Sequence, residues 1–234
     1  MRPFFSYYGA KWRIAAKCPA PQYDKIIEPF AGSAGYSVRY GSSLVDLYDI
    51  SPSISRIWQG LINTSAEEIL NLPIDNFELI SELDLPKWCC DLIGYWIAKG
   101  REYPAKSWSA WGRQFRGGDA ARVWGWKVRE RIASQIAMIQ GWSFSPSSYE
   151  LISNQRATWF IDPPYQGECG RRYECSDIDY SHLADWCLSR KGQVIVCEAE
   201  GAKWLPFKTL GAFQGTNSTN RARISKEVIF TQEK

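Results

Sequence analysis

The stretch "TWFIDPPYQG" (158–167) places a carboxylate, two prolines and an aromatic ring directly after an apolar run. Two successive prolines exclude a helix and remove two backbone donors, and they favour extended backbone at Asp162. The sequence therefore predicts a rigid strand end that carries Asp162 and Tyr165. At such a strand end, the carboxylate can accept hydrogen bonds from an amino group, and the ring can stack on a planar base.

An exocyclic amine of a nucleobase is a weak nucleophile because its lone pair is delocalised into the ring. Two acceptors on its hydrogens would raise electron density on the nitrogen. Asp162 and the carbonyl of Pro163 could supply them, with Pro164 holding that carbonyl in place, and Tyr165 would stack on the base. The tetrapeptide by itself fits a rigid strand-to-loop corner equally well, so other residues must decide between the two interpretations.

A second pattern, "EPFAGSAG" (28–35), contains the end of a strand predicted over 24–30 and the turn of small residues that follows it. Its small residues let backbone N–H groups and a helix N-terminus approach a ligand closely. Asp49 ends a second strand, predicted over 43–51, where an acid can hydrogen-bond a ribose hydroxyl pair. The glycines alone fit a turn without a ligand, and Asp49 could instead cap a helix beginning at Pro52. Together their spacing favours a nucleoside cleft.

These residues require a parallel α/β sheet, and the pattern of the chain supplies its elements. Further strands are predicted over 158–162, 193–199 and 225–232. Helices are predicted to begin at the capping box of Ser65 and to extend over 180–190. A helix within 119–140 is expected to stop at Gly141 and to bury the stripe Val128, Ile132, Ile136 and Ile139. The strands fall on either side of a segment rich in tryptophan and basic residues.

Composition excludes several functions. The chain has 234 residues, which suits one domain with a modest insertion, and its net charge of +3 does not by itself indicate a nucleic-acid partner. The single histidine, His182, lies in a helix-like stretch, and the seven cysteines form no Cys-x-x-Cys pair, so neither a zinc site nor a histidine-based hydrolase is expected. The absence of a signal peptide and of a run of about eighteen apolar residues favours a cytoplasmic protein.

Three patterns of the chain resemble, in the same order, the motifs of the Dam-like N6-adenine-specific DNA methyltransferases. "FFSYYGAKWR" (4–13) is similar to the N-terminal cofactor motif of that family, with Tyr7, Gly9 and Lys11 at the matching positions. "EPFAGSAG" is similar to its S-adenosylmethionine loop, and "DPPY" matches its catalytic motif. The resemblance extends over nearly the whole chain except about 84–131.

Two further stretches bear on the resemblance. Asp49 matches the ribose-binding acid of the family, and "NRARISKEVIF" (220–230) is similar to the basic stretch before its last hairpin strand. The chain also departs from the family pattern. Tyr7 stands where a tryptophan is usual, and "VCEAE" stands where many relatives carry Ser-Asn, so that Glu198 has no assigned role.

The resemblance implies an α/β, Rossmann-like, S-adenosylmethionine-dependent methyltransferase fold with a seven-stranded mixed sheet. It implies a catalytic domain formed by 1–83 and 132–234, with a small helical and loop target-recognition insertion over 84–131. It implies transfer of a methyl group from S-adenosyl-L-methionine to N6 of a flipped-out adenine, with S-adenosyl-L-homocysteine as product. The insertion does not resemble that of the GATC-specific members, so no target sequence carries over.

The motif matches assign roles to individual residues. The expected catalytic residues are Asp162, Pro163, Pro164 and Tyr165. The expected cofactor-binding residues are Tyr7, Gly9, Lys11, Glu28, Pro29, Phe30, Ala31, Gly32, Ser33, Ala34, Asp49, Ile50 and Asp162. The arginines expected to bind DNA, each of which could equally be a solvated charge, are Arg113, Arg116, Arg171, Arg172, Arg221 and Arg223.

The expected partner is double-stranded DNA, and the expected state is a cytoplasmic monomer of bacterial or phage origin that requires no metal and no membrane. Two alternatives stay open: methylation of cytosine at N4, which uses similar chemistry, and a catalytically silent DNA-binding relative. Glutamine methylation of a protein is disfavoured, because those relatives carry Asn-Pro-Pro-Tyr.

Overall fold

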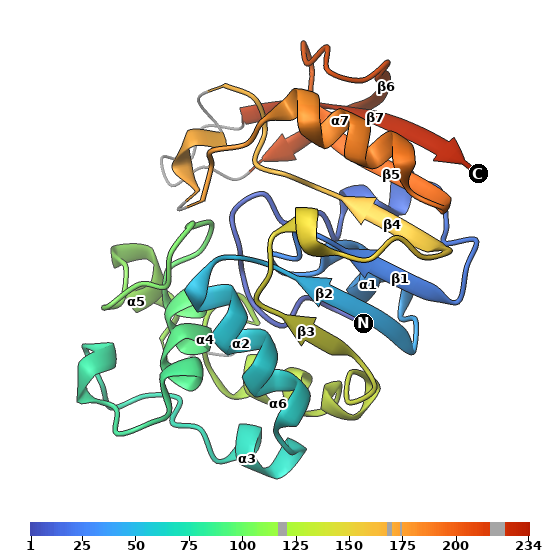
Figure 1. Ribbon diagram of the computed structural model, residues 1–234. Helices are drawn as coiled ribbons and strands as arrows, with labels where there is room; N and C mark the ends of the chain where they lie inside the picture. The colour runs from blue at the N-terminus through green and yellow to red at the C-terminus, as the bar shows by residue number, and fades with distance from the viewer. Residues whose placement is uncertain (117–120, 168–169, 174, 216–222) are drawn as a thin grey trace.

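The predicted α/β sheet is present, and it contains seven strands among the residues that the structure describes (Figure 1). The structure is a computed structural model that describes residues 1–116, 121–167, 170–173, 175–215 and 223–234. β1 to β5 run parallel, and β7 is antiparallel to both of its neighbours, so the sheet is mixed as expected. In sheet order the strands are β3 (Ser143–Ser145), β2 (Leu44–Tyr48), β1 (Lys25–Glu28), β4 (Ala157–Ile161), β5 (Gly192–Ala199), β7 (Arg223–Glu233) and β6 (Lys208–Gly215).

The chain order reverses between β1 and β4, and this reversal positions the candidate site. β2 and β3 lie on one side of β1, whereas β4 and β5 lie on the other, with Ile27 opposite Trp159. In an open parallel sheet, ligands bind outside the carboxyl ends of the strands at such a reversal. Asp49 and Asp162 directly follow β2 and β4, so the topology brings both carboxylates to this edge.

Alternate side chains of the central strands divide the interior into two apolar cores. On one face of the sheet, Ile26 and Phe160 pack with α1 (Gly35–Tyr40) and the N-terminal segment. On the other face, Trp159 packs with α7 (Tyr180–Ser189). Every residue of β4 is buried, which explains why its sequence is a continuous apolar run without alternation.

The helix starts that the sequence predicts after β2 are confirmed. α2 (Pro52–Asn63) has Pro52 at its beginning, where a missing N–H costs nothing. α3 (Ala66–Leu70) begins with a complete capping box, in which Ser65 and Glu68 satisfy each other's backbone N–H groups.

The helix expected within 119–140 is shorter than its sequence suggests. α6 (Trp126–Ala133) ends well before Gly141, and a 3-10 turn follows it, so the predicted stop is wrong. Periodicity still identified the core face, because its members are all buried: Val128, Ile132, Ile136 and Ile139.

Four elements carry no clear sequence signal: β3, β6, α4 (Lys87–Ile97) and α5 (Ala110–Phe115). β3 has only three residues, none of them buried, and β6 contains two glycines, Gly211 and Gly215. α4 is buried continuously from Cys89 to Ile97 and therefore lacks the polar face that marks a surface helix.

The tryptophan-rich segment packs directly on the N-terminal half of the chain. α4 contacts α2, where Arg56 Nε donates to Asp91 Oδ2 at 2.7 Å. Trp96 Nε1 donates to the carbonyl of Phe4 at 2.8 Å, and the boundary expected at 131 falls inside α6. Three tryptophans of this segment belong to the core: Trp96, Trp108 and Trp124 are buried, whereas Trp111 and Trp126 are exposed.

Neither a membrane-spanning helix nor a metal-binding group is found in the part of the chain that the structure describes. There, no helix is long and apolar enough to cross a membrane. No group of three or more His, Cys, Asp or Glu side chains is arranged to hold a metal ion in those residues either. His182 is 51% exposed and its Nδ1 atom lies 2.8 Å from the hydroxyl of Tyr149, which agrees with a surface role.

Candidate active site

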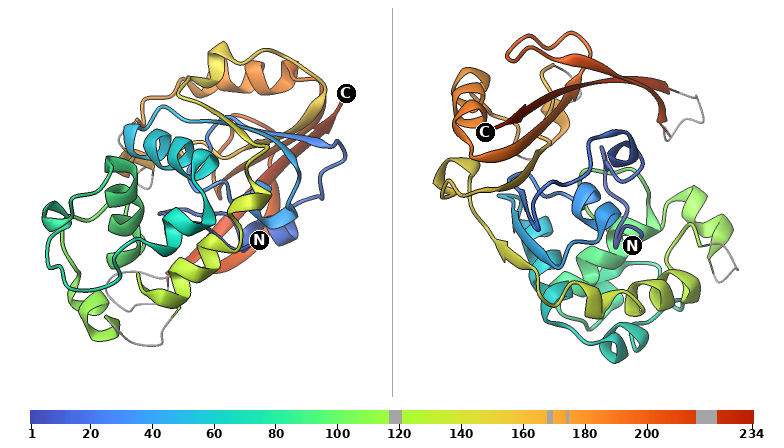
Figure 2. Two further views of the ribbon diagram at one scale, coloured as in Figure 1. Left: turned by 90° about the horizontal axis from the view of Figure 1, so that it is seen from below. Right: turned by 90° about the vertical axis from the view of Figure 1, so that its right-hand side faces the viewer.

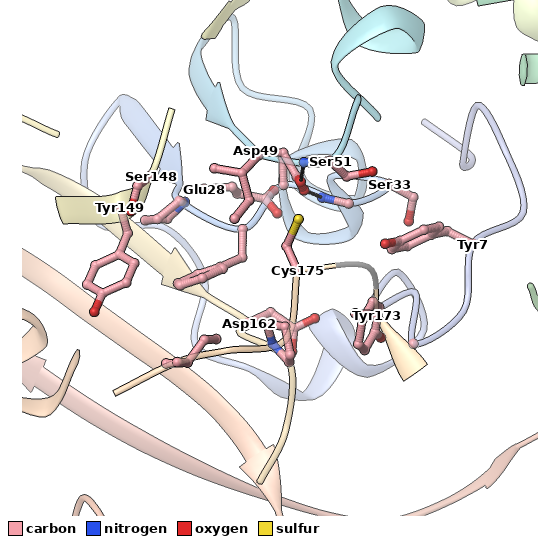
Figure 3. A pocket seen from close by; sticks show the side chains of 18 of the residues that line it. Tyr7, Glu28, Ser33, Asp49, Ser51, Ser148, Tyr149, Asp162, Tyr173 and Cys175 are labelled. Carbon is pink, nitrogen blue, oxygen red and sulfur yellow. Dashed lines mark hydrogen bonds between the residues drawn. The ribbon is translucent and has the colours of Figure 1, made fainter. Parts of the chain in front are cut away.

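A pocket lies at the carboxyl ends of β1, β2 and β4 (Figure 3). Asp49 lies on one side of the pocket and Asp162 on the other, with Tyr149 at one end and Tyr7 at the opposite end. Ala34 is fully buried and does not line the pocket. All other predicted cofactor residues do: Tyr7, Gly9, Lys11, Glu28, Pro29, Phe30, Ala31, Gly32, Ser33, Asp49, Ile50 and Asp162.

Asp49 joins the turn after β1 to the loop after β2. Its Oδ2 atom accepts a hydrogen bond from the N–H of Gly32 at 2.8 Å, and its Oδ1 atom accepts one from the N–H of Ser51 at 2.9 Å. Ser51 is the N-cap residue of α2, so Asp49 supports the helix start and lines the pocket at the same time. Burial raises the pKa of Asp49, and the main-chain donors oppose that shift.

Two glycines allow the backbone to approach aromatic rings at the pocket. Gly32 has a φ of +45°, and a Cβ atom there would lie 3.0 Å from the ring of Tyr7. Gly9 has a φ of +70°, and a Cβ atom there would lie 2.3 Å from the hydroxyl oxygen of Tyr173. Both the left-handed backbone and the lack of space require glycine. The ring centroids of the two tyrosines are 6.0 Å apart, so they form one aromatic wall.

Glu28, the last residue of β1, lines the pocket although it is only 1% exposed. Its Oε1 atom accepts a hydrogen bond from the N–H of Ser37 in α1 at 2.7 Å. Burial raises the pKa of Glu28 to about 8, and the hydrogen bonds from Ser37 oppose the shift. The side chain is therefore mostly protonated at neutral pH.

Asp162 forms a buried ion pair with Lys11. The Lys11 Nζ atom lies 2.9 Å from Asp162 Oδ1 and also donates to the carbonyl of Gly9 at 2.9 Å. Burial raises the pKa of Asp162 to about 6, although Lys11 opposes the shift. Burial also disfavours the charged form of Lys11, but Asp162 and Glu227 outweigh it and raise the pKa of Lys11. Oδ1 is buried and accepts no hydrogen bond of ordinary geometry from the described residues.

Tyr165 is held by a carboxylate from a distant strand. Its hydroxyl donates to Oε2 of Glu227 in β7, and Ser225 Oγ donates to Oε1 of that carboxylate at 2.6 Å. Lys11 Nζ lies 4.5 Å from the Tyr165 ring centroid. Burial and the neighbouring carboxylates raise the pKa of Tyr165, which keeps its hydroxyl a donor. Neither Tyr165 nor Pro163 lines the pocket that contains Asp162.

Glu198, which the sequence left without a role, anchors the loop that follows the Asp-Pro-Pro-Tyr motif. It is fully buried at the end of β5. Its Oε2 atom accepts hydrogen bonds from the N–H of Gln166 at 3.2 Å and from Trp204 Nε1 at 3.0 Å. Burial raises its pKa, and these donors oppose the shift. Glu198 therefore fixes the main chain beside Tyr165.

The two insertion arginines expected to read DNA are paired with an acid. Arg113 lies inside α5, and Arg116 directly follows that helix. Arg113 Nε lies 3.5 Å from Glu78 Oε2, and Arg116 pairs with Oε1 of the same residue. The Arg116 guanidinium also lies 5.4 Å from the ring centroid of Trp108.

The other predicted DNA-binding arginines lie near the pocket or outside the described residues. Arg171 and Arg172 belong to a short 3-10 helix after the Asp-Pro-Pro-Tyr motif. Arg172 Nη1 lies 3.8 Å from Glu102, which lines the pocket. Arg221 lies outside the described residues, as does the side chain of Arg223 at the start of β7.

Several pocket residues escape sequence reasoning. One group follows β3, whose short strand gives no signal. A second group follows the Asp-Pro-Pro-Tyr motif, and two single residues, Ser51 and Glu102, follow β2 and α4. A prediction of β3 would have placed the first group at the correct edge of the sheet. The missed residues include Ser51, Glu102, Ser147, Ser148, Tyr149, Glu150, Tyr173, Cys175, Asp177, Ile178 and Asp179.

No protein-family model matches the chain, and no curated protein matches its sequence. The fold and the geometry of the pocket therefore carry the functional argument. The pocket combines a carboxylate after each of β2 and β4, a glycine turn between β1 and α1, and an aromatic wall formed by Tyr7 and Tyr173.

Proposed function

We propose that the protein transfers a methyl group from S-adenosyl-L-methionine to N6 of an adenine flipped out of double-stranded DNA. One observation carries this proposal. Asp162, which begins a motif suited to holding an amino group, lines the same pocket as Asp49 and the glycine turn, which are suited to a nucleoside. A methyl donor and a methyl acceptor would thus meet at one carboxylate.

The residues of the pocket fit the proposed cofactor. Four aspartates in its lining suit a ligand with a sulfonium charge and with hydroxyl and ammonium donors: Asp49, Asp162, Asp177 and Asp179. A carboxylate offers about four acceptor sites. The main-chain donors of Gly32, Ile50 and Ser51 fill only part of that capacity at Asp49, which leaves room for a ribose hydroxyl.

S-adenosyl-L-methionine would supply an electrophilic methyl group. Ionised Asp162 would accept a hydrogen bond from the adenine amino group, and the carbonyl of Pro163 would accept a second. These two acceptors would make the lone pair of N6 available and hold it in line for attack, and alignment of this kind contributes much of the rate. Loss of the methyl group would leave S-adenosyl-L-homocysteine as the second product, and the proton that N6 sheds would pass to Asp162 or to water.

The neighbours of Asp162 support this role. At neutral pH a pKa of about 6 leaves the carboxylate mostly ionised. Lys11 compensates its charge from 2.9 Å away without occupying the Oδ1 atom by a well-directed hydrogen bond. An amine inside a paired and stacked duplex cannot reach the site, so the adenine would have to be flipped out. Tyr165 would then offer its ring to the flipped base.

A nucleoside assay tests the proposal. The protein is incubated with radiolabelled S-adenosylmethionine and mixed-sequence duplex DNA, which is then digested to nucleosides. Label in N6-methyladenosine is the expected result, and an Asp162→Ala variant serves as the inactive control. Label in N4-methylcytidine would assign the alternative reaction. Absence of label in either nucleoside would overturn the proposal and favour a DNA-binding relative.

A further inference from the structure

We propose that a cluster of basic residues beside the pocket binds the sugar–phosphate backbone of duplex DNA. This inference rests on the proposed function for the identity of the polyanion, and it adds residues that the sequence-based assignment of DNA contacts leaves out. The cluster draws on the N-terminal segment, the end of α4, the residues before α6 and α6 itself. We call it the basic cluster. Lys99 and Arg131 lie against one tryptophan ring, and Arg2, Arg13 and Arg122 lie near enough to act on the charge of one or the other.

Two cations of the basic cluster share one tryptophan ring. Lys99 Nζ and Arg131 Cζ lie 5.5 Å and 5.2 Å from the ring centroid of Trp96. Lys99 Nζ is also 5.7 Å from Trp111, whose side chain is 37% exposed. Arg131 Nη1 donates to the carbonyl of Pro3 at 3.1 Å, whereas its Nη2 is buried without a partner among the described residues. The rings therefore hold two like charges close together.

Among the described residues, no acid pairs with the basic cluster. None of its members forms an ion pair with a carboxylate in the part of the chain that the structure describes. Partial burial and the nearby Arg122, Arg131 and Arg13 lower the pKa of Lys99 to about 8. Burial and Arg2 lower the pKa of Arg131 to about 10. A bound polyanion would relieve this repulsion.

Three of the arginines that the sequence marks for DNA differ in this respect. Arg113 and Arg116 both pair with Glu78, and Arg172 lies 3.8 Å from Glu102. Phosphate groups would have to displace those carboxylates. The basic cluster needs no such exchange, so we infer that it supplies the larger share of the non-specific, salt-dependent affinity.

The position of the basic cluster fits a duplex that delivers a base to the pocket. The N–H of Tyr8, which lines the pocket, donates to the carbonyl of Arg101 at 3.1 Å, and Lys99 lies just before Arg101. In the right view of Figure 2, the N-terminal segment (dark blue) lies between the helices of the insertion (green) below and the C-terminal hairpin (red) above. The segment that carries Lys99 is thus hydrogen-bonded to a residue that lines the pocket.

Fluorescence anisotropy with a labelled duplex tests the inference. The Lys99→Gln/Arg122→Gln variant removes two exposed charges. Its affinity should fall about 10- to 100-fold near physiological salt, and the slope of log K against log salt should drop by about 2. The control is Arg156→Gln/Lys191→Gln, which removes the same charges from exposed residues that precede β4 and β5 at the opposite edge of the sheet. The control should bind DNA like the unaltered protein.

An unchanged salt slope in the Lys99→Gln/Arg122→Gln variant would overturn the inference, as would an equal loss in the control. Melting temperature and cofactor binding identify a variant that simply misfolds, and Lys99→Arg, which keeps the charge, should then retain DNA affinity. The two proposals fail separately. DNA binding through the basic cluster without methyl transfer would leave the inference standing and remove the proposed function. Methyl transfer with full DNA affinity in the double variant would do the reverse.

Discussion

The hydroxyl of Tyr165, in the loop after β4, donates a hydrogen bond to the buried carboxylate of Glu227 in the antiparallel strand β7. Ser225 holds the other oxygen of that carboxylate at 2.6 Å. The ring that we propose to stack on the target base is therefore oriented by the C-terminal hairpin, and not only by the proline-rich motif that carries it.

Removing the carboxylate should affect turnover more than cofactor binding. Glu227→Ala is expected to lower kcat by about 10- to 100-fold, because a hydrogen bond to a charged group is worth about 1.5–3 kcal/mol. Glu227→Gln retains an acceptor and should lose less. Fluorescence of 2-aminopurine at the target position reports stacking of the flipped base on Tyr165. Glu200→Gln is the control, since Glu200 is an exposed acid paired with Lys226. Normal turnover and stacking in Glu227→Ala would show that Glu227 only supports the fold.

Asp162→Asn should abolish turnover and also destabilise the protein. The loss in kcat should be about 100-fold or more, as for other preorganised polar groups at a reacting centre. Lys11 would remain buried without its partner at a cost of about 3 kcal/mol. Adding Lys11→Met should restore part of the stability, measured by urea unfolding, but none of the activity. Recovery of activity in the double variant would contradict the assignment of Asp162.

The reaction should require ionised Asp162. Because burial raises the pKa of Asp162 to about 6, kcat/KM should fall about tenfold per pH unit below that value. Lys11 lowers this pKa, so Lys11→Met should shift the inflection to higher pH, whereas Lys11→Arg should leave it nearly unchanged. A flat profile between pH 5 and pH 7, or an inflection that Lys11→Met does not move, would refute this view.

Glu28 should make folding stability depend on pH. Its pKa is raised from 4.5 to about 8, so the folded state holds a proton that the unfolded state releases above pH 4.5. The free energy of unfolding should therefore fall as pH rises from about 5 to 8, by about 1 kcal/mol per unit. Glu28→Gln should lack this component. Urea unfolding of both proteins at pH 5 and pH 8 measures it, and an equal difference between them at the two pH values would exclude it.

DNA affinity should fall at alkaline pH through Lys99. Its free pKa is lowered to about 8, and bound phosphate should raise it again, so binding takes up a proton. Affinity should fall about tenfold from pH 7 to pH 9. Three charged groups from different segments lie near Lys99: Arg13, Arg122 and Arg131. Its aromatic neighbours are Trp96 and Trp111. Lys99→Arg should remove the pH dependence, and its persistence in that variant would assign the effect elsewhere.

The sequence predicted most of the sheet because central strands are short apolar runs bounded by turn residues. It also located the carboxylates, since Asp49 and Asp162 each end such a run. It did not predict β3, which is short and unburied, or α4, whose apolar residues face protein on all sides. Periodicity requires one face in water, so an element fully inside or fully outside the core leaves little pattern.

The sequence by itself determined which chemical groups line the pocket. These are a carboxylate beside two rigid prolines, a glycine turn after the first strand, and a second carboxylate after the next strand. Only the tertiary structure decided the partners of those groups. Lys11 meets Asp162, and Tyr165 meets Glu227, although the members of each pair lie far apart in the sequence. The physical reason is that local propensities act over a few residues, whereas ion pairs and buried hydrogen bonds depend on which strands the sheet places side by side.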